Sequence, residues 1–197
     1  ESTGLYGKSS LRICDLGGAL IKKISIDGIF SEGCAVYNSE IVQLSYKAGV
    51  AMVFTYPSLQ KVREYAYHGE GWGLTHNGEN FIMSNGSDTL YMRDSNFKIV
   101  KKLPVTYKGK PLVRLNELEW VDGRIYANVW YSDFIFDIDE NTGHVERAID
   151  CSHLSQSLPS LKEQDVLNGI AFNSQDQTFF ITGKNWPITF CIRIPMP

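Results

Sequence analysis

The sequence predicts an all-β fold, a five-bladed β-propeller of four-stranded antiparallel blades. Strand signals dominate the whole chain, and helical periodicity is weak throughout. Strand pairs recur, joined by short turns in which Gly, Asn, Asp and Ser gather. The order of strands and turns also repeats about every 40 to 50 residues, which is typical of propeller blades.

Four hairpins carry the strongest strand signals, because β-branched and aromatic residues lie on both sides of a turn. They cover residues 39–56, 80–94, 124–139 and 177–194. Each is preceded by one further strand, at residues 31–40, 69–79, 115–124 and 167–176. The first three are also followed by one more strand, at residues 61–67, 98–107 and 144–150. A repeat therefore contains four strands in a fixed order.

The opening strands set the length of the repeat. They start near residues 32, 72, 117 and 168, so that successive starts are 40, 45 and 51 residues apart. The best helical candidate covers residues 152–165, where Pro159 limits the length of any helix. A β-sandwich of hairpins is the alternative fold, but a sandwich does not require the recurring order.

Residues 2–26 contain two or three strands without an opening strand. Together with the four recognisable repeats they indicate five blades, of which the first is incomplete. A propeller closes by joining its two chain ends within one blade. We therefore expect a single β-propeller domain over residues 1–197 that is truncated at its N-terminal side.

Composition excludes some classes of partner. The chain has 197 residues, 43% of them hydrophobic, and a formal net charge of −3. It lacks the basic footprint that nucleic-acid backbones require, so no nucleic acid is expected as a partner. No apolar run approaches the roughly 20 residues of a membrane span, so no membrane is expected either. The four scattered cysteines allow one or two disulfides or free thiols, and the compartment stays open.

No metal or cofactor site is predicted. The four histidines have no ligand spacing with nearby Cys, Asp or Glu. The run from Asp137 to Asn141 lacks the glycine and the distal glutamate of a calcium loop. We expect that no cofactor is required, while a structural cation held by oxygen ligands in a propeller channel stays open.

Six motifs in this order together carry a family resemblance: ESTGLYGKSSLR, SEG, GWGLT, RLNELEWVDGRIYANVW, DVLNGIA and TGKNWP. They span nearly the whole chain, and the fourth is long and specific. With them the sequence resembles the plant and bacterial type of glutaminyl cyclase.

The resemblance implies a five-bladed β-propeller and an activity. The expected enzyme is a glutaminyl-peptide cyclotransferase that cyclises N-terminal glutamine to pyroglutamate and releases ammonia. It would act without a metal on peptides or proteins with an N-terminal Gln, and as a monomer. The resemblance also favours a secreted or periplasmic protein.

The resemblance also implies three catalytic residues. The Phe-Gly-Glu-Gly motif of the family corresponds to Phe30–Gly33, which makes Glu32 the proton shuttle. Such a carboxyl group needs a raised pKa, which aromatic walls favour by desolvation. Asn116 would bind the glutamine carboxamide, because its side chain both donates and accepts hydrogen bonds. Lys184 would supply a cation near the oxyanion.

Three aromatic residues are implied to bind the substrate, namely Trp72, Trp130 and Tyr46, the last at a position where the family has a third tryptophan. Considered without the resemblance, each tryptophan is more readily a core residue of a blade. Glu32 alone would be a solvated carboxylate at the start of a strand.

Two other functions stay open at this point. The chain could be a propeller that binds peptides or serves as a scaffold without chemistry, because one fold hosts many functions. A hydrolase or lyase acting on sugars or lactones would need a metal-ligand cluster, which the sequence does not show.

Residues 116–120 pose a question of strand geometry. Regular strand alternation puts Asn116 and Glu117 on opposite faces, so only a bulge would let both side chains enter one pocket. The resemblance implies that Asn116 and Trp130 face the substrate, and it leaves Glu117, Glu119 and Trp120 to bond neighbouring blades or fill their cores.

Overall fold

The computed structural model describes residues 1–159 and 161–195, most of which lie in short antiparallel strands. The chain divides into two compact units. The first contains residues 1–85 and 91–102, and the second contains residues 86–90 and 103–197. In both units the sheets are meanders, in which each strand pairs with the next strand along the chain.

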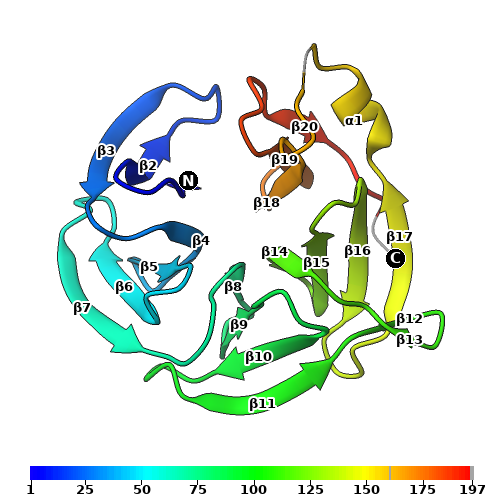
Figure 1. Cartoon of the computed structure of the whole chain (residues 1–197), viewed down its shortest axis with the longest axis horizontal. Helices are drawn as coiled ribbons and strands as arrows, with labels where there is room; N and C mark the ends of the chain where they lie inside the picture. The colour runs from blue at the N-terminus through cyan, green and yellow to red at the C-terminus, as the bar shows by residue number, and fades with distance from the viewer. Residues whose placement is uncertain (160, 196–197) are drawn as a thin grey trace. The chain divides into compact units, whose positions relative to one another are not determined.

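The first unit holds two complete sheets and most of a third (Figure 1). The first sheet has three strands: β1 (Ser2–Thr3), β2 (Ser9–Cys14) and β3 (Leu20–Ile26). The second sheet has four: β4 (Ser31–Tyr37), β5 (Glu40–Ser45), β6 (Val50–Thr55) and β7 (Lys61–Ala66). The third sheet also has four: β8 (Leu74–His76), β9 (Phe81–Met83), β10 (Thr89–Arg93) and β11 (Ile99–Pro104).

The second unit holds two larger sheets, one small hairpin and one helix. The four-stranded sheet contains β14 (Leu115–Val121), β15 (Arg124–Val129), β16 (Phe134–Asp139) and β17 (Val145–Asp150). The other sheet contains β18 (Leu167–Asn173), β19 (Thr178–Gly183) and β20 (Phe190–Ile192). The hairpin is β12 (Thr106–Tyr107) with β13 (Lys110–Pro111), and the helix is α1 (Ser152–Gln156).

The five meander sheets confirm the repeat order read from the sequence, including all four predicted hairpins. The first sheet has three strands, as expected. The last sheet also has three described strands. The helix ends before Pro159, as predicted. The hairpin β12–β13 was not predicted, because two-residue strands are too short to show an alternating pattern.

Each unit has apolar residues packed between its sheets. In the first unit, β5 and β6 are buried along most of their length, and Leu44, Ala51 and Val53 are 0% exposed. In the second unit, Tyr126 and Phe179 pack at 4.8 Å between ring centroids, and both are 0% exposed. The outer strands are mostly exposed and carry lysines, which discourage pairing with another sheet edge.

The opening strand of the second sheet contains a β-bulge. Ser31 pairs with Ser45, but the next pair along the ladder is Cys34 with Gln43. Leu44 therefore faces two residues, Glu32 and Gly33. A bulge of this kind interrupts the regular alternation of side chains and re-aims the residues that it contains.

The same bulge recurs in both larger sheets of the second unit. In β14 the register shifts between residues 115 and 118, so that Asn128 faces both Asn116 and Glu117. In β18 it shifts between residues 167 and 170, so that Thr182 faces both Asn168 and Gly169. The expectation that Asn116 and Glu117 lie on opposite faces applied to a regular strand. Because β14 contains a bulge at these two residues, regular alternation does not apply to them.

The third sheet shows the same two-against-one arrangement just before β8. The backbone N–H of Trp72 donates to the carbonyl oxygen of Ser84 at 3.1 Å, and the N–H of Ser84 donates to the carbonyl oxygen of Gly73 at 3.0 Å. The hydroxyl oxygen of Ser84 also accepts from the N–H of Gly73 at 2.8 Å. All four opening strands of the described chain therefore carry a bulge at the same place.

Gly33→Ala tests the packing of the first bulge. An added Cβ would lie 2.7 Å from both the backbone nitrogen of Leu74 and the carbonyl oxygen of Trp72, and backbone atoms cannot move aside as a side chain can. We expect the free energy of unfolding to fall by about 2 kcal/mol, measured by urea denaturation.

Gly17→Ala is the matched control. Its Cβ would meet only the Asp15 carboxylate oxygen at 3.3 Å in an exposed turn, so a change below about 0.5 kcal/mol is expected. Equal losses in the two variants would contradict the tight packing of Gly33.

Candidate active site

Three of the six predicted site residues begin a bulge. Glu32 begins the bulge of β4, Trp72 the bulge before β8, and Asn116 the bulge of β14. Motifs far apart in the sequence thus place a carboxylate, an indole and an amide at equivalent positions of three sheets.

The other three predicted residues also share one structural position, because each directly follows the second strand of its sheet. Their backbone N–H groups all donate to the carbonyl of the residue two places before the bulge. The pairs are Tyr46 to Phe30 at 2.8 Å, Trp130 to Arg114 at 2.9 Å and Lys184 to Val166 at 2.9 Å.

The two units divide these residues equally, and each unit forms its own group. Glu32, Tyr46 and Trp72 belong to the first unit. The second unit contains Asn116, Trp130 and Lys184.

In the first unit, the backbone around Glu32 is fixed by the neighbouring sheet. The N–H of Gly33 donates to the carbonyl oxygen of Trp72 at 2.7 Å, which joins the two bulges. Glu32 itself is partly buried. Its negative charge acts on Tyr67, whose pKa is raised chiefly by burial and further by Glu32. The Tyr67 hydroxyl donates to the carbonyl oxygen of Ser45.

Trp72 and Tyr46 are held by one ion pair. The indole N–H of Trp72 donates to the Glu70 carboxylate at 3.0 Å. Glu70 also lies 3.5 Å from the ammonium of Lys47, which stands 4.7 Å from the centroid of the Tyr46 ring. Because this ion pair is half exposed, it orients the two rings more than it stabilises the fold.

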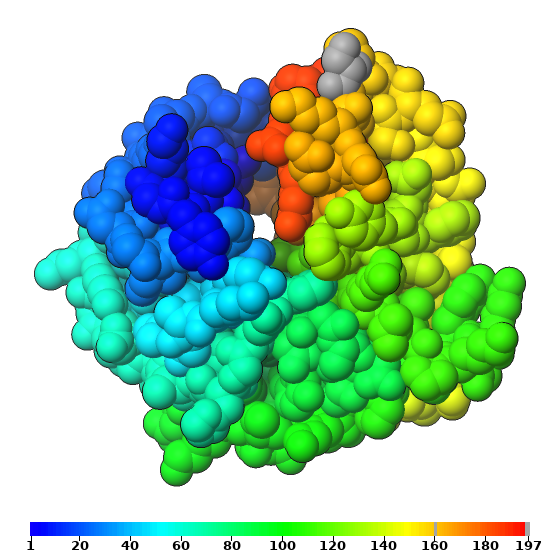
Figure 2. Space-filling model, in the orientation of Figure 1, coloured from blue at the N-terminus to red at the C-terminus, as the bar shows by residue number. Residues whose placement is uncertain are grey.

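A row of aromatic rings leads away from Tyr46. Phe30, two residues before Glu32, lies 5.8 Å from Tyr46 and 5.0 Å from Tyr6, measured between ring centroids. Tyr6 is 68% exposed, and the segment that carries it, dark blue in Figure 2, lies on the surface. Glu32 therefore follows, by two residues, a ring that belongs to this row.

In the second unit, the structure brings Lys184 and Trp130 together. The Lys184 ammonium lies 5.9 Å from the centroid of the Trp130 ring, within the range of a cation–π interaction. The ring of Tyr131 also stacks on Trp130, at 4.7 Å between centroids with an interplanar angle of 30°. Both predicted residues are partly buried.

Asn116 is only 3% exposed, and Asn128, which faces its bulge, is 0% exposed. The side-chain oxygen of Asn128 accepts from the N–H of Gly169 at 2.9 Å. Asn128 thus connects the bulge of β14 with the bulge of β18. Sequence analysis missed Asn128, Tyr67 and Glu70, although Asn128 lies inside the fourth motif and the other two lie within five residues of Trp72.

Glu119 bonds two neighbouring sheets, as predicted, whereas the hydrogen bond of Trp120 stays with its own sheet. The Glu119 carboxylate accepts from the N–H of Phe172 at 3.2 Å, which bonds β14 to β18. The indole N–H of Trp120 donates to the Glu140 carboxylate at 2.6 Å. Burial raises the pKa of Glu119 to about 8.

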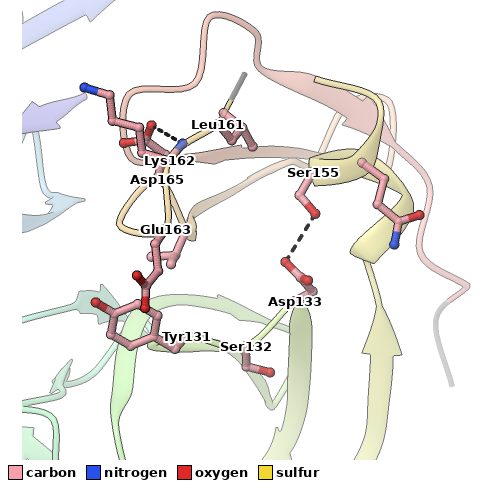
Figure 3. A pocket seen from close by; sticks show the side chains of 10 residues that line it. Tyr131, Ser132, Asp133, Ser155, Leu161, Lys162, Glu163 and Asp165 are labelled. Atoms are coloured by element: carbon pink, nitrogen blue, oxygen red, sulfur yellow. Dashed lines mark hydrogen bonds between the residues drawn. The ribbon is translucent and has the colours of Figure 1, made fainter. Parts of the chain in front are cut away.

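A surface cavity of about 360 Å³ lies elsewhere in the second unit (Figure 3). Residues 131–133 line one part of it, and the end of helix α1 together with loop residues between 161 and 166 lines the rest. The Ser155 hydroxyl donates to the Asp133 carboxylate at 3.3 Å, and the backbone N–H of Lys162 donates to the Asp165 carboxylate at 2.9 Å. None of the six predicted residues lines this cavity.

Within residues 1–159 and 161–195, no group of three His, Cys, Asp or Glu side chains could hold a metal ion. His76 stacks on Tyr37 at 3.7 Å, and burial lowers its pKa to about 4. All four cysteines are free thiols. No helix of the described part of the chain is long and apolar enough to cross a membrane.

Two relatives match nearly the whole chain. The glutaminyl-peptide cyclotransferase of Arabidopsis thaliana is 37% identical over 200 residues, which is 98% of this chain and 62% of that protein. The crystal structure of the glutaminyl cyclase of Myxococcus xanthus superposes with a TM-score of 0.90 at 33% identity, covering 94% of this chain and 82% of that one. The chain thus spans about three fifths of the length of the plant relative.

This structural match confirms the predicted fold class: the five sheets are the blades of a five-bladed β-propeller. The family model for glutamine cyclotransferase matches residues 1–194. The chain belongs to the glutamine cyclotransferase family.

Glu119→Gln tests the buried carboxyl between β14 and β18. A pKa raised from 4.5 to about 8 means that the folded state keeps a proton which the unfolded state releases. Stability should therefore fall as the pH rises from about 4.5 to 8, by at most about 1.4 kcal/mol per pH unit. The glutamine variant removes this loss, so its advantage in melting temperature over the unmodified protein should grow across this window.

Glu146→Gln, at an exposed position of β17, is the control and should leave the pH dependence of stability unchanged. If the Glu119→Gln curve runs parallel to that of the unmodified protein from pH 5 to 8, the raised pKa of Glu119 is wrong.

Proposed function

We propose that this chain cyclises the N-terminal glutamine of peptides or proteins to pyroglutamate and releases ammonia. Membership of the glutamine cyclotransferase family supports the reaction. The observation that carries the assignment of residues is that all six predicted site residues occupy just two equivalent positions of the sheets.

The reaction is an intramolecular aminolysis. The α-amino nitrogen attacks the carbon of the side-chain carboxamide, and a new C–N bond closes a five-membered ring. The bond from this carbon to the amide nitrogen breaks, and the nitrogen leaves as ammonia with the proton that the amine gave up. The substrate provides its own nucleophile, so the protein has to move a proton, stabilise an oxyanion and hold the chain folded back.

Glu32 is the proposed proton shuttle, and it takes the proton from the amine and gives it to the departing nitrogen. A group with both tasks works best when its pKa lies near the operating pH. Glu32 is partly buried, and Phe30, two residues before it, packs against Tyr46. This burial supports the role because desolvation favours the neutral form of a carboxyl group.

Asn116 and Lys184 are the proposed polar contacts of the carboxamide. The Asn116 side chain can donate to the carboxamide oxygen and accept from its nitrogen. Lys184 would stabilise the negative charge that develops on this oxygen. Its ammonium lies over the Trp130 ring, which supports a defined position for the charge.

Trp72, Trp130 and Tyr46 are the proposed binding residues for the apolar part of the glutamine side chain. Flat rings exclude water around a small side chain and bind it without competing hydrogen bonds. The hydrogen bond from Trp72 to Glu70 and the stacking of Trp130 on Tyr131 support fixed orientations for both indoles.

This mechanism requires no metal and no cofactor, because a glutamate and a lysine supply the proton transfer and the charge. We further propose that the protein acts as a monomer, and that its partners are peptides or proteins with N-terminal Gln rather than nucleic acids or membranes.

Glu32→Gln is the decisive variant. Removing the titratable group should lower kcat by about 100-fold or more, because general acid–base catalysis contributes on this scale. Release of ammonia from a Gln-initiated peptide, with the loss of 17 mass units followed by mass spectrometry, measures the reaction. The melting temperature should stay close to that of the unmodified protein.

Glu79→Gln, at an exposed turn of the same unit, is the control and should retain full turnover. Robust turnover by Glu32→Gln would remove Glu32 from the mechanism. A folded chain that binds the peptide without releasing ammonia would instead be a peptide-binding propeller.

Chelation tests the independence from metals. After dialysis against EDTA the chain should cyclise Gln-peptides at a rate within about twofold of the untreated protein, because no step passes through a metal ion. Loss of turnover that added Zn²⁺ or Ca²⁺ restores would contradict this part of the proposal.

A further inference from the structure

The bulge position is occupied by an unassigned side chain in one sheet. Four opening strands carry the bulge, and in three of them its first residue is a proposed site residue: Glu32, Trp72 and Asn116. In the fourth, β18, the first residue of the bulge is Asn168. The family resemblance gave this residue no role.

Asn168 has an unsatisfied hydrogen-bond acceptor. Its side-chain oxygen is buried and has no hydrogen-bond partner within residues 1–159 and 161–195. Buried polar atoms in folded proteins almost always have a partner, and the exceptions concentrate where a ligand or a water molecule completes the site.

The backbone on both sides of Asn168 is fixed within the second unit. The N–H of Gly169 donates to the Asn128 side chain at 2.9 Å. The carbonyl of Val166, two residues before Asn168, accepts from the N–H of Lys184 at 2.9 Å. Asn168 therefore lies at the same end of the sheet as Lys184, whose ammonium reaches the Trp130 ring.

We infer that Asn168 is a further substrate-binding residue, whose side-chain oxygen accepts a hydrogen bond from the α-amino group of the N-terminal glutamine. This inference rests on the proposed function. The substrate can donate hydrogen bonds from its side-chain carboxamide and from its α-amino group. The carboxamide is already assigned to Asn116. The amine is therefore left for Asn168, which occupies the equivalent bulge position in β18. The hydrogen bond would orient the attacking nitrogen without titrating in the working pH range.

Asn168→Ala and Asn168→Asp test the acceptor. Loss of one hydrogen bond to a charged or reacting group should raise KM for a Gln-initiated peptide by about tenfold in the alanine variant, with a smaller change in kcat. Aspartate keeps an oxygen at the same place, so its KM should lie closer to that of the unmodified protein. Ammonia release gives both constants.

Asn173→Ala is the matched control, an asparagine on the same strand that bonds only within its own turn, to Asp176 and Gln175. It should leave both constants unchanged. If Asn168→Ala fails to fold, Asn168→Leu replaces it, because leucine fills a similar volume without an acceptor.

The outcomes separate this inference from the proposed function. If the unmodified chain and Asn173→Ala turn over and Glu32→Gln does not, but a folded Asn168→Ala keeps its KM, then Asn168 is structural and the inference is wrong. An aspartate variant no better than alanine also overturns it.

If the unmodified chain releases no ammonia, the proposed function fails, and calorimetric titration with the same peptide decides about Asn168. A tenfold weaker affinity of Asn168→Ala than of the unmodified chain supports the contact. Equal affinities, or no binding by the unmodified chain, overturn it.

Discussion

The structure depends on one local constraint, the β-bulge near the start of every opening strand that it describes. In an antiparallel ladder each residue normally faces one partner, and neighbouring side chains point to opposite faces. Here Leu44, Ser84, Asn128 and Thr182 each face two residues instead of one. The bulge interrupts the regular alternation at the first residue of each pair and re-aims its side chain. The fold thus creates one such position in each of four sheets.

The bulges need small residues and neighbouring donors. Glycine follows the first bulge residue in three of the four sheets, at Gly33, Gly73 and Gly169. A Cβ at Gly33 would strike backbone atoms at 2.7 Å, and one at Gly169 would lie 2.6 Å from the Thr182 methyl group. The N–H groups of two of these glycines join neighbouring sheets. Gly33 donates to the carbonyl oxygen of Trp72, and Gly169 donates to the side-chain oxygen of Asn128. The same contacts that fix the bulge therefore connect neighbouring sheets, which explains how a weak local irregularity is kept in place.

Much of the fold follows from the sequence, because hairpins and repeat spacing depend on patterns along the chain that each segment carries by itself. The site residues came from motifs, but their geometry did not, because strand periodicity alone cannot show where a ladder loses its register. The pairs Glu32-Gly33, Trp72-Gly73 and Asn168-Gly169 were visible, and an isolated glycine in a strand is a recognised sign of a bulge. The pair Asn116-Glu117 lacks that sign. Contacts such as that of Asn128 with Gly169 join residues 41 positions apart, and no local pattern encodes them.

Equivalent positions do not carry equivalent chemistry, and this difference matters for the function. The four bulges present one carboxyl group, one indole and two amides, at Glu32, Trp72, Asn116 and Asn168. Amides and indoles do not exchange protons near neutral pH, whereas a carboxyl group does. Within this set, only Glu32 can move a proton, and the other three can bind and orient a substrate. A repeated backbone therefore supplies the positions, and in the proposed mechanism the unrepeated side chains divide the work between proton transfer and recognition.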